Sequence, residues 1–170
     1  MVFDRECQVN REVQTQPWGG LSGRLSEAGH VLPVRVYFED TDFSGLVYHT
    51  SYLRWCERGR SDYLRLLGIR HAELAAGAFA GEPCAFAVRR IAADYLKPAR
   101  IDEILEVQTA TGAVTKASLV LKQEIARDGI PIFRLEAQCV LLSMSGRLLR
   151  LPSAIASIFT PGGDTGPQCA

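Results

Sequence analysis

The segment that decides the fold runs from residue 34 to residue 60 and reads VRVYFEDTDFSGLVYHTSYLRWCERGR. Residues 34–38 alternate between side chains that suit opposite faces of a sheet, which predicts a β-strand. The acidic, glycine-containing run 39–45 predicts a tight loop. From residue 49 onward the apolar residues recur every three or four positions, which predicts a helix. Every later expectation rests on this order of strand, loop and long helix.

The predicted helix carries one apolar stripe and one charged surface. The stripe consists of Tyr52, Cys56, Gly59, Tyr63 and Leu67. The charged surface consists of Arg54, Glu57, Arg58, Asp62 and Arg65, in which Arg58 and Asp62 are spaced as an i,i+4 ion pair. Glycine within a helix weakens it by roughly 1 kcal/mol relative to alanine, and a close approach to a sheet would explain Gly59. Gly68 is placed to end the helix in the left-handed conformation.

The rest of the chain has the alternation and turn signals of β-strands. A one-residue shift of the apolar register at Arg89-Arg90 predicts a bulge, and Asp128-Gly129 predicts a hairpin. One helix and one mostly antiparallel sheet predict an α+β domain in which the sheet curls around the helix. The expected strands after the helix are 86–95, 104–109, 117–127, 132–143 and 148–151, followed by a short helical turn at 154–159.

The ends of the chain differ from this domain in composition. Residues 1–30 are polar and rich in turn formers, which predicts a mobile N-terminal extension. Residues 160–170 contain two Pro/Gly clusters and predict a disordered tail. The domain is therefore expected to span residues 31–159.

Charge and cysteine content exclude several classes of function. The chain has 19 basic and 19 acidic residues, so it lacks the basic excess typical of nucleic-acid binders. Its five cysteines are widely spaced and contain no Cys-x-x-Cys pair, which is neither a disulfide framework nor a zinc site. No apolar run is long enough to span a bilayer, and residues 1–10 lack the apolar core expected of a secretory signal. A protein of the reducing cytoplasm is the simplest expectation.

The loop before the helix is the densest cluster of reactive side chains. A helix that begins near His49 would aim free backbone N–H groups at the loop, where they could bind a phosphate or polarise a carbonyl. Asp40 or Asp42 beside that carbonyl could activate water or attack directly. The same residues, or Thr50 and Ser51, could simply cap the helix, and an Asp-rich turn before a helix more often does so. No metal site is expected, because His49 is the one nearby nitrogen ligand, and the chain lacks a Gly-x-Ser-x-Gly elbow.

Several runs of the sequence resemble the 4-hydroxybenzoyl-CoA thioesterase class of hotdog-fold proteins, most closely the Tol–Pal-cluster (YbgC-like) branch. The runs are VYFEDTDFSGLVYHTSY at 36–52, ERGR at 57–60 and DYLKPARIDE at 94–103, with support from 116–118, 128–129 and 150–152. This resemblance implies a hotdog fold, in which a long central helix is wrapped by a five- to six-stranded antiparallel sheet. It also implies a homodimer or homotetramer that hydrolyses an acyl-CoA or acyl-carrier-protein thioester without any cofactor, CoA being part of the substrate.

The resemblance assigns roles to single residues. Asp42 matches the catalytic carboxylate, and the backbone N–H of His49 matches the group that polarises the carbonyl. Tyr48 and the His49 side chain would then line the acyl pocket or position water. Lys116 is the first candidate for a contact to the CoA phosphates, with Arg89 and Arg90 as weaker candidates that ordinary solvated charges would explain equally well.

Three features leave the substrate and the chemistry open. Phe43, followed by Ser44-Gly45, replaces a smaller residue of commoner family members and is expected to reshape the acyl site. Glu57 on the helix is an alternative catalytic carboxylate, because some hotdog thioesterases place theirs there. The alternatives to hydrolysis are dehydration of a hydroxyacyl thioester, which needs a catalytic histidine, and binding of an acyl thioester or lipid without catalysis.

Overall fold

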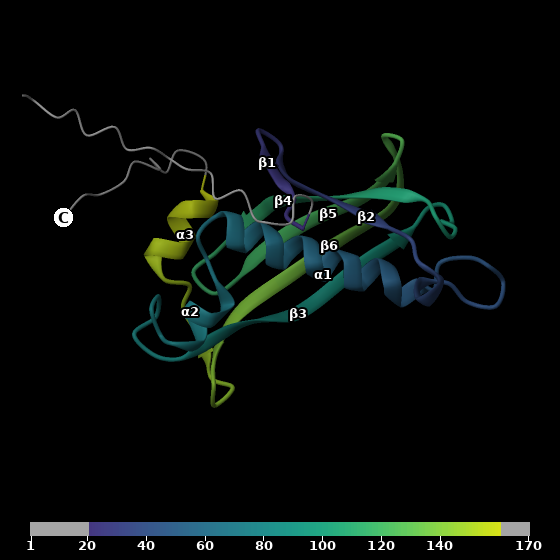
Figure 1. The fold of residues 1–170 in the computed structure, drawn as a ribbon. Helices are drawn as coiled ribbons and strands as arrows, with labels where there is room; N and C mark the ends of the chain where they lie inside the picture. The colour runs from purple at the N-terminus through teal and green to yellow at the C-terminus, as the bar shows by residue number, and fades with distance from the viewer. Residues whose placement is uncertain (1–20, 161–170) are drawn as a thin grey trace, which may run out of the picture.

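The computed structural model describes residues 21–160, in which one long helix, α1 (His49–Leu66), lies across one face of a curved antiparallel sheet (Figure 1). The strands run in the order β1-β2-β4-β5-β6-β3, and β7 pairs with β6. This confirms the predicted α+β hotdog fold. The strands are β1 (Arg24–Ser26), β2 (Gly29–Arg35), β3 (Cys84–Tyr95), β4 (Ile104–Val114), β5 (Leu119–Arg127), β6 (Ile130–Ser143) and β7 (Leu148–Leu149). The shorter helices are the 3-10 turn η1 (Phe38–Asp40), α2 (His71–Ala75) and α3 (Ser153–Phe159).

Contact between α1 and the sheet explains the glycine on the apolar stripe. A Cβ added to Gly59 would lie 2.9 Å from Val107 Cγ1 and 3.2 Å from Thr109 Oγ1, so the predicted close approach is confirmed. On either side of this contact the helix buries large side chains, of which Trp55 is 1% exposed. Burial of apolar surface contributes about 25 cal/mol per Å², so the helix is fixed on the sheet mainly by this face.

Three local predictions are also confirmed. Gly68 has φ +83° and ends α1 in the left-handed conformation. Asp128 and Gly129 both have positive φ and join β5 to β6. The pairing of β3 with β6 shifts register between Val88 and Arg90, which is the predicted bulge.

The folded domain begins earlier than the sequence predicted. Strand β1 and the start of β2 lie inside the stretch 1–30, so the prediction of a mobile extension is wrong for its last residues. These segments are too short to show a clear period in the sequence. Strand β1 is held by pairing with β2, and β2 is held in turn by pairing with β4, which lies far away in sequence. Residues 1–20 of the expected extension and 161–170 of the expected tail lie outside the described residues.

The charged surface predicted for the helix is wrong at one position. Asp62 is 7% exposed and pairs with His30 at 2.8 Å, accepts the Gly23 N–H at 2.7 Å and forms an ion pair with Arg65. The predicted pair of Asp62 with Arg58 does not form. Asp62 is therefore a buried link between the β1–β2 hairpin and the helix.

Candidate active site

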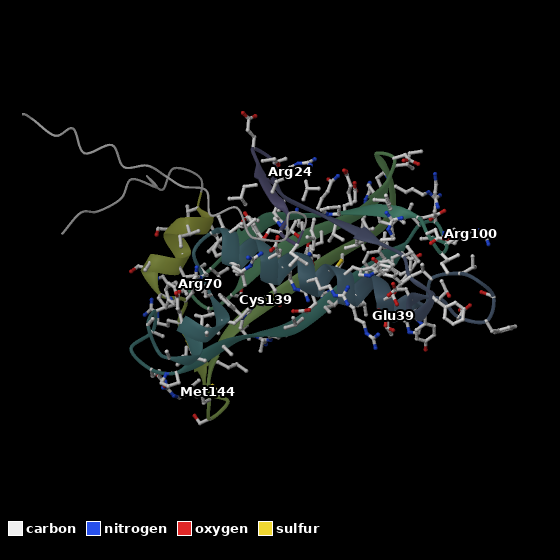
Figure 2. The ribbon with its side chains drawn as sticks, viewed as in Figure 1. Arg24, Glu39, Arg70, Arg100, Cys139 and Met144 are labelled. Carbon is white, nitrogen blue, oxygen red and sulfur yellow. The ribbon has the colours of Figure 1, made fainter. Side chains whose placement is uncertain are left out.

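A closed loop between η1 and α1 presents the predicted catalytic residue. Thr41 and Val47 form an antiparallel bridge, and the Asp42 N–H donates to the Leu46 carbonyl at 2.9 Å. Gly45 has φ +75°, which its missing side chain permits at the tip. Figure 2 shows Glu39 and Arg100 near this loop, at the end of the molecule where α1 begins, while Arg70 and Met144 lie at the other end.

Asp42 is a fully exposed carboxylate held in its charged form. Its Oδ1 accepts hydrogen bonds from the Ser44 hydroxyl and, at 2.8 Å, from the Ser44 N–H. These bonds, the hydroxyl first, lower the pKa of Asp42 below its ordinary value. The residue is therefore available as a base or nucleophile at neutral pH.

Asp40 lies two residues away and has a structural role instead. It is 7% exposed, and its Oδ2 accepts the Tyr37 N–H at 3.0 Å. Its carbonyl accepts the Tyr48 N–H at 2.8 Å and the Ser51 hydroxyl at 3.3 Å. Asp40 thus holds the start of α1 against η1. Among the described residues, the Asp42 carboxylate is bonded only by Ser44, within the loop.

The start of α1 is not capped by a side chain. Tyr48 is the N-cap residue and makes no side-chain cap bond, so the prediction that Asp40, Asp42, Thr50 or Ser51 caps this helix is wrong. Among residues 21–160 no acceptor bonds the His49 N–H, which is the first N–H of an 18-residue helix. An unpaired N–H at the positive end of a helix dipole can stabilise negative charge on a carbonyl oxygen.

Aromatic residues lie in the loop and at the start of the helix. The rings of Tyr48 and His49 lie 4.4 Å apart, and both side chains are exposed. Phe43 is fully exposed at the loop tip. The Tyr95 hydroxyl donates to the His49 carbonyl at 3.0 Å and ties β3 to the helix start. The structure therefore gathers Asp42, Phe43, Gly45, Tyr48 and His49 at one end of the molecule.

The other predicted site residues lie elsewhere in the same chain. Arg89 and Arg90 are exposed at the bulge of β3. Glu57 is exposed on α1 and accepts the Ser61 hydroxyl at 2.8 Å. Lys116 follows the far end of β4, which at about 3.3 Å per residue is roughly 33 Å from the end near the loop. One chain therefore does not bring Lys116 to Asp42.

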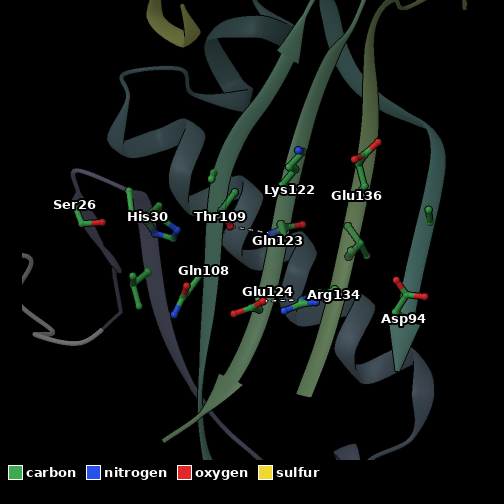
Figure 3. Close-up of a pocket in the computed structure, with 15 residues that line it drawn as sticks. Ser26, His30, Asp94, Gln108, Thr109, Lys122, Gln123, Glu124, Arg134 and Glu136 are labelled. Carbon is green, nitrogen blue, oxygen red and sulfur yellow. Dashed lines mark hydrogen bonds and ion pairs between the residues drawn. The ribbon is translucent and has the colours of Figure 1, made fainter. Parts of the chain in front are cut away.

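The hollow on the sheet does not include the loop. The hollow in Figure 3 has a volume of about 600 Å³ and lies on the sheet face opposite α1, with the Glu124–Arg134 ion pair, 2.9 Å, across it. Four cavities lined by described residues, this hollow among them, have no Asp42, Tyr48 or His49 in their walls. The reactive groups are open to solvent in a single chain.

Two residues near the loop were missed from the sequence. Ser44 holds the Asp42 carboxylate, and its position two residues after an aspartate is a turn pattern that could have signalled this bond. Tyr95 reaches the helix start from a strand 46 residues later, and no local signal predicts that contact. Between residues 21 and 160 no three His, Cys, Asp or Glu side chains gather as a metal site would require, and no helix there is long and apolar enough to cross a membrane.

Comparisons with known proteins agree with this architecture. Residues 44–132, more than half of the chain, match the family described as thioesterase superfamily. The acyl-CoA thioester hydrolase YbgC of Escherichia coli is 44% identical over 93 residues, which are 55% of this chain and 66% of that protein. The acyl-CoA thioesterase YbgC of Helicobacter pylori is 32% identical over 74% of this chain and 92% of its own.

A solved structure shows the same fold in three dimensions. The probable thioesterase from Bartonella henselae superposes with a TM-score of 0.70 at 36% identity, covering 72% of this chain and 98% of that one. This chain therefore belongs to the thioesterase superfamily, as a hotdog-fold member related to the YbgC acyl-CoA thioesterases.

Proposed function

We propose that this chain hydrolyses acyl-CoA thioesters to a free acid and CoA, with Asp42 and the His49 N–H as its reactive groups. The observation that carries the proposal is their juxtaposition. A charged, solvent-accessible carboxylate lies inside the loop closed by Thr41 and Val47, and an N–H without an acceptor lies two residues beyond that loop. The names of the related proteins support the same activity.

In the proposed mechanism the His49 N–H donates a hydrogen bond to the thioester oxygen and stabilises the oxyanion that forms there. Asp42 takes a proton from water as the water oxygen attacks the carbonyl carbon. Collapse of the tetrahedral intermediate breaks the C–S bond, and the proton leaves with the CoA thiol. A direct attack by Asp42 would give a mixed anhydride, and oxygen-isotope incorporation into Asp42 in a single turnover separates the two routes.

A second copy of the chain is needed to enclose this site. Strand β3 is a 12-residue edge strand whose Val88, Ile91 and Tyr95 side chains are 45%, 43% and 50% exposed. Long apolar edge strands pair readily with another chain. Two-fold pairing about the middle of β3 would place Tyr95, and with it His49, beside Cys84 of the second copy. We propose a homodimer joined in this way, which can associate further into a tetramer.

The same pairing supports the proposed CoA contacts. It brings the far end of the second copy towards the loop, and that end carries Lys116. Arg89 and Arg90, at the centre of β3, would lie at the dimer contact. Phe43 at the loop tip would face the entering acyl group. The use of an acyl-carrier protein in place of CoA, and a cytoplasmic location, stay predictions.

The test is release of free thiol from a panel of short-chain, long-chain and aromatic acyl-CoAs. We expect turnover by the wild type, a loss of roughly 10²–10⁴-fold in kcat/KM for Asp42→Asn and a much smaller change for Glu57→Gln. A larger loss for Glu57→Gln than for Asp42→Asn would assign the catalytic carboxylate to Glu57 instead. Binding of acyl-CoA without thiol release would favour the binding-module alternative. Water loss from a hydroxyacyl-CoA that disappears in His49→Ala would favour the dehydratase.

A further inference from the structure

Arg60, on the middle of α1, is a buried cation without a counter-ion. It is 8% exposed, and its Nη1 donates to Gln123 Oε1 at 2.7 Å. Gln123 is held in turn by the Cys56 carbonyl at 2.8 Å and the Thr109 hydroxyl at 2.9 Å, so its amide is fixed. None of the five ion pairs formed among residues 21–160 includes Arg60.

An unpaired buried charge is costly in a protein interior, and such groups are retained where a ligand or partner completes them. The guanidinium of Arg60 is close enough to two buried thiols to act on them. Burial raises the pKa of Cys56 to about 12, and the charge of Arg60 opposes that rise. The same two effects act on Cys139, whose pKa is also raised. The charge of Arg60 therefore lies in a mostly apolar region.

That region contains a small cavity of about 110 Å³ between α1 and β3. At roughly 30 Å³ per water-sized group, it has room for about four such groups. Its walls are mostly apolar, and the polar side chains of Glu57, Ser61 and His71 also line it. Glu57 does not neutralise Arg60, because it is exposed, accepts the Ser61 hydroxyl and forms no ion pair among the described residues. The apolar side chains in the wall are Leu64, Phe86, Ala87, Val88, Leu119 and Leu121.

The cavity lies too far from the reactive groups of its own chain for a short acyl group to join them. Arg60 is eleven residues after His49, which is about 16 Å along a helix. The proposed dimer brings a different His49 close. Two-fold pairing of β3 places Phe86 and Val88, which line the cavity, near the Tyr95 end of the second copy, where Tyr95 bonds the His49 carbonyl.

We infer that Arg60 binds the far end of the acyl group, so that the substrates are CoA thioesters of short acids with a second, terminal carboxylate. This inference rests on the proposed function. The thioester carbonyl would lie at Asp42 and His49 of one copy, and the terminal carboxylate would supply the missing counter-ion of Arg60 in the other. A methyl-terminated chain of the same length would leave the guanidinium unpaired and bind more weakly. Arg60 is thus a specificity-determining residue.

The experiment compares matched substrates on two Arg60 variants. Glutaryl-CoA is paired with pentanoyl-CoA, and adipoyl-CoA with hexanoyl-CoA, and kcat/KM is measured for each. For the wild type we expect kcat/KM to be roughly ten- to a hundredfold higher for the substrate with the terminal carboxylate in each pair. This is the gain expected of a charge-assisted hydrogen bond. Arg60→Met should abolish or reverse the preference, and Arg60→Lys should retain part of it. If the role of Arg60 is purely structural, Arg60→Met should instead lower kcat/KM equally for both substrates of a pair.

Binding of the free acids tests the site without catalysis. Glutarate should raise the Tm of the wild type more than pentanoate does, and Arg60→Met should remove the difference. Removal of an unpaired buried charge is not expected to unfold the chain, and circular dichroism checks this. If the wild type hydrolyses pentanoyl-CoA as well as glutaryl-CoA and glutarate has no effect on the Tm, the inference is wrong and the proposed function stands. If no acyl-CoA is hydrolysed, the proposed function fails, and the free-acid comparison still decides whether Arg60 binds carboxylates.

Discussion

Asp42, in the loop before helix α1, and Asp62, near the end of that helix, have carboxylates in opposite environments. At the start, Asp42 is fully exposed and its single set of partners belongs to Ser44, two residues away. Near the end, Asp62 is buried and receives bonds from three separate segments, through Gly23, His30 and Arg65. Burial alone would raise the pKa of Asp62. These hydrogen bonds outweigh burial, so the pKa lies below its ordinary value.

This difference separates a structural carboxylate, that of Asp62, from the one that we propose to be reactive, that of Asp42. A buried carboxylate whose oxygens are all occupied joins parts of the fold and has no bond left to offer a substrate. Asp42 is exposed and keeps lone pairs free for a substrate, and in the proposed mechanism the His49 N–H binds the electrophile. We therefore expect changes at the start of α1 to alter kcat/KM, and changes near its end to alter the free energy of unfolding.

A large effect on catalysis should come from deleting the His49 N–H while leaving the helix intact. Proline lacks the N–H and is tolerated at the first helical position. Tyr48 already has the extended backbone, φ −66° and ψ 136°, that a following proline requires. We expect His49→Pro to lower kcat/KM by roughly 10²–10³-fold relative to His49→Ala. Since both variants lack the imidazole, equal activities would rule out the N–H as the oxyanion donor.

The next effect is on the stability of the fold and comes from Asp62, near the end of α1. Asp62→Asn removes the charge that pairs with His30 and Arg65, and should lower the free energy of unfolding by about 1–3 kcal/mol. Denaturant unfolding measures this change. The matched control is Asp102→Asn, because Asp102 is exposed and has a positive φ of 68° that asparagine also adopts. An Asp62 variant as stable as this control would show that the buried network is dispensable.

The smallest effect is a change in protonation. The Ser44 hydroxyl is the first cause of the lowered pKa of Asp42, so Ser44→Ala should raise that pKa towards its ordinary value of 3.8. A hydrogen bond to a carboxylate favours the charged form, so its loss favours protonation and moves the acid limb of activity to higher pH. The carboxyl carbon shift of Asp42 against pH reports the change directly by NMR. An unchanged titration would mean that Ser44 does not bond Asp42 in solution.

The sequence predicted the parts of the fold that depend on neighbours along the chain. The helix period, the end at Gly68 and the hairpin at Asp128-Gly129 are local patterns and were confirmed. Asp62 was placed on the wrong face because its partner, His30, is 32 residues away and no helical period reports such a contact. Strand β1 was missed for a different reason: it is three residues long, and its pairing with β2 holds it rather than its own composition.

The candidate site was predictable only with the family resemblance. From spacing alone, Asp42 and Asp40 were equal candidates for a helix cap, and the structure shows that neither caps α1. The bonds that separate them, to Ser44 and to the Tyr37 N–H, depend on the loop conformation. The unpaired state of Arg60 had no sequence signal, because an arginine in a helix of alternating charges normally faces solvent.

One paired measurement tests whether Asp42 serves the chemistry and Asp62 the stability of the fold. Asp42→Asn and Asp62→Asn would be compared for kcat/KM on the best acyl-CoA, at a temperature where both variants are folded, together with their Tm values. The account predicts that Asp42→Asn loses activity by at least about 10²-fold with an unchanged Tm, while Asp62→Asn has a lowered Tm and retains its kcat/KM. An Asp42→Asn protein with near-normal kcat/KM would contradict the account.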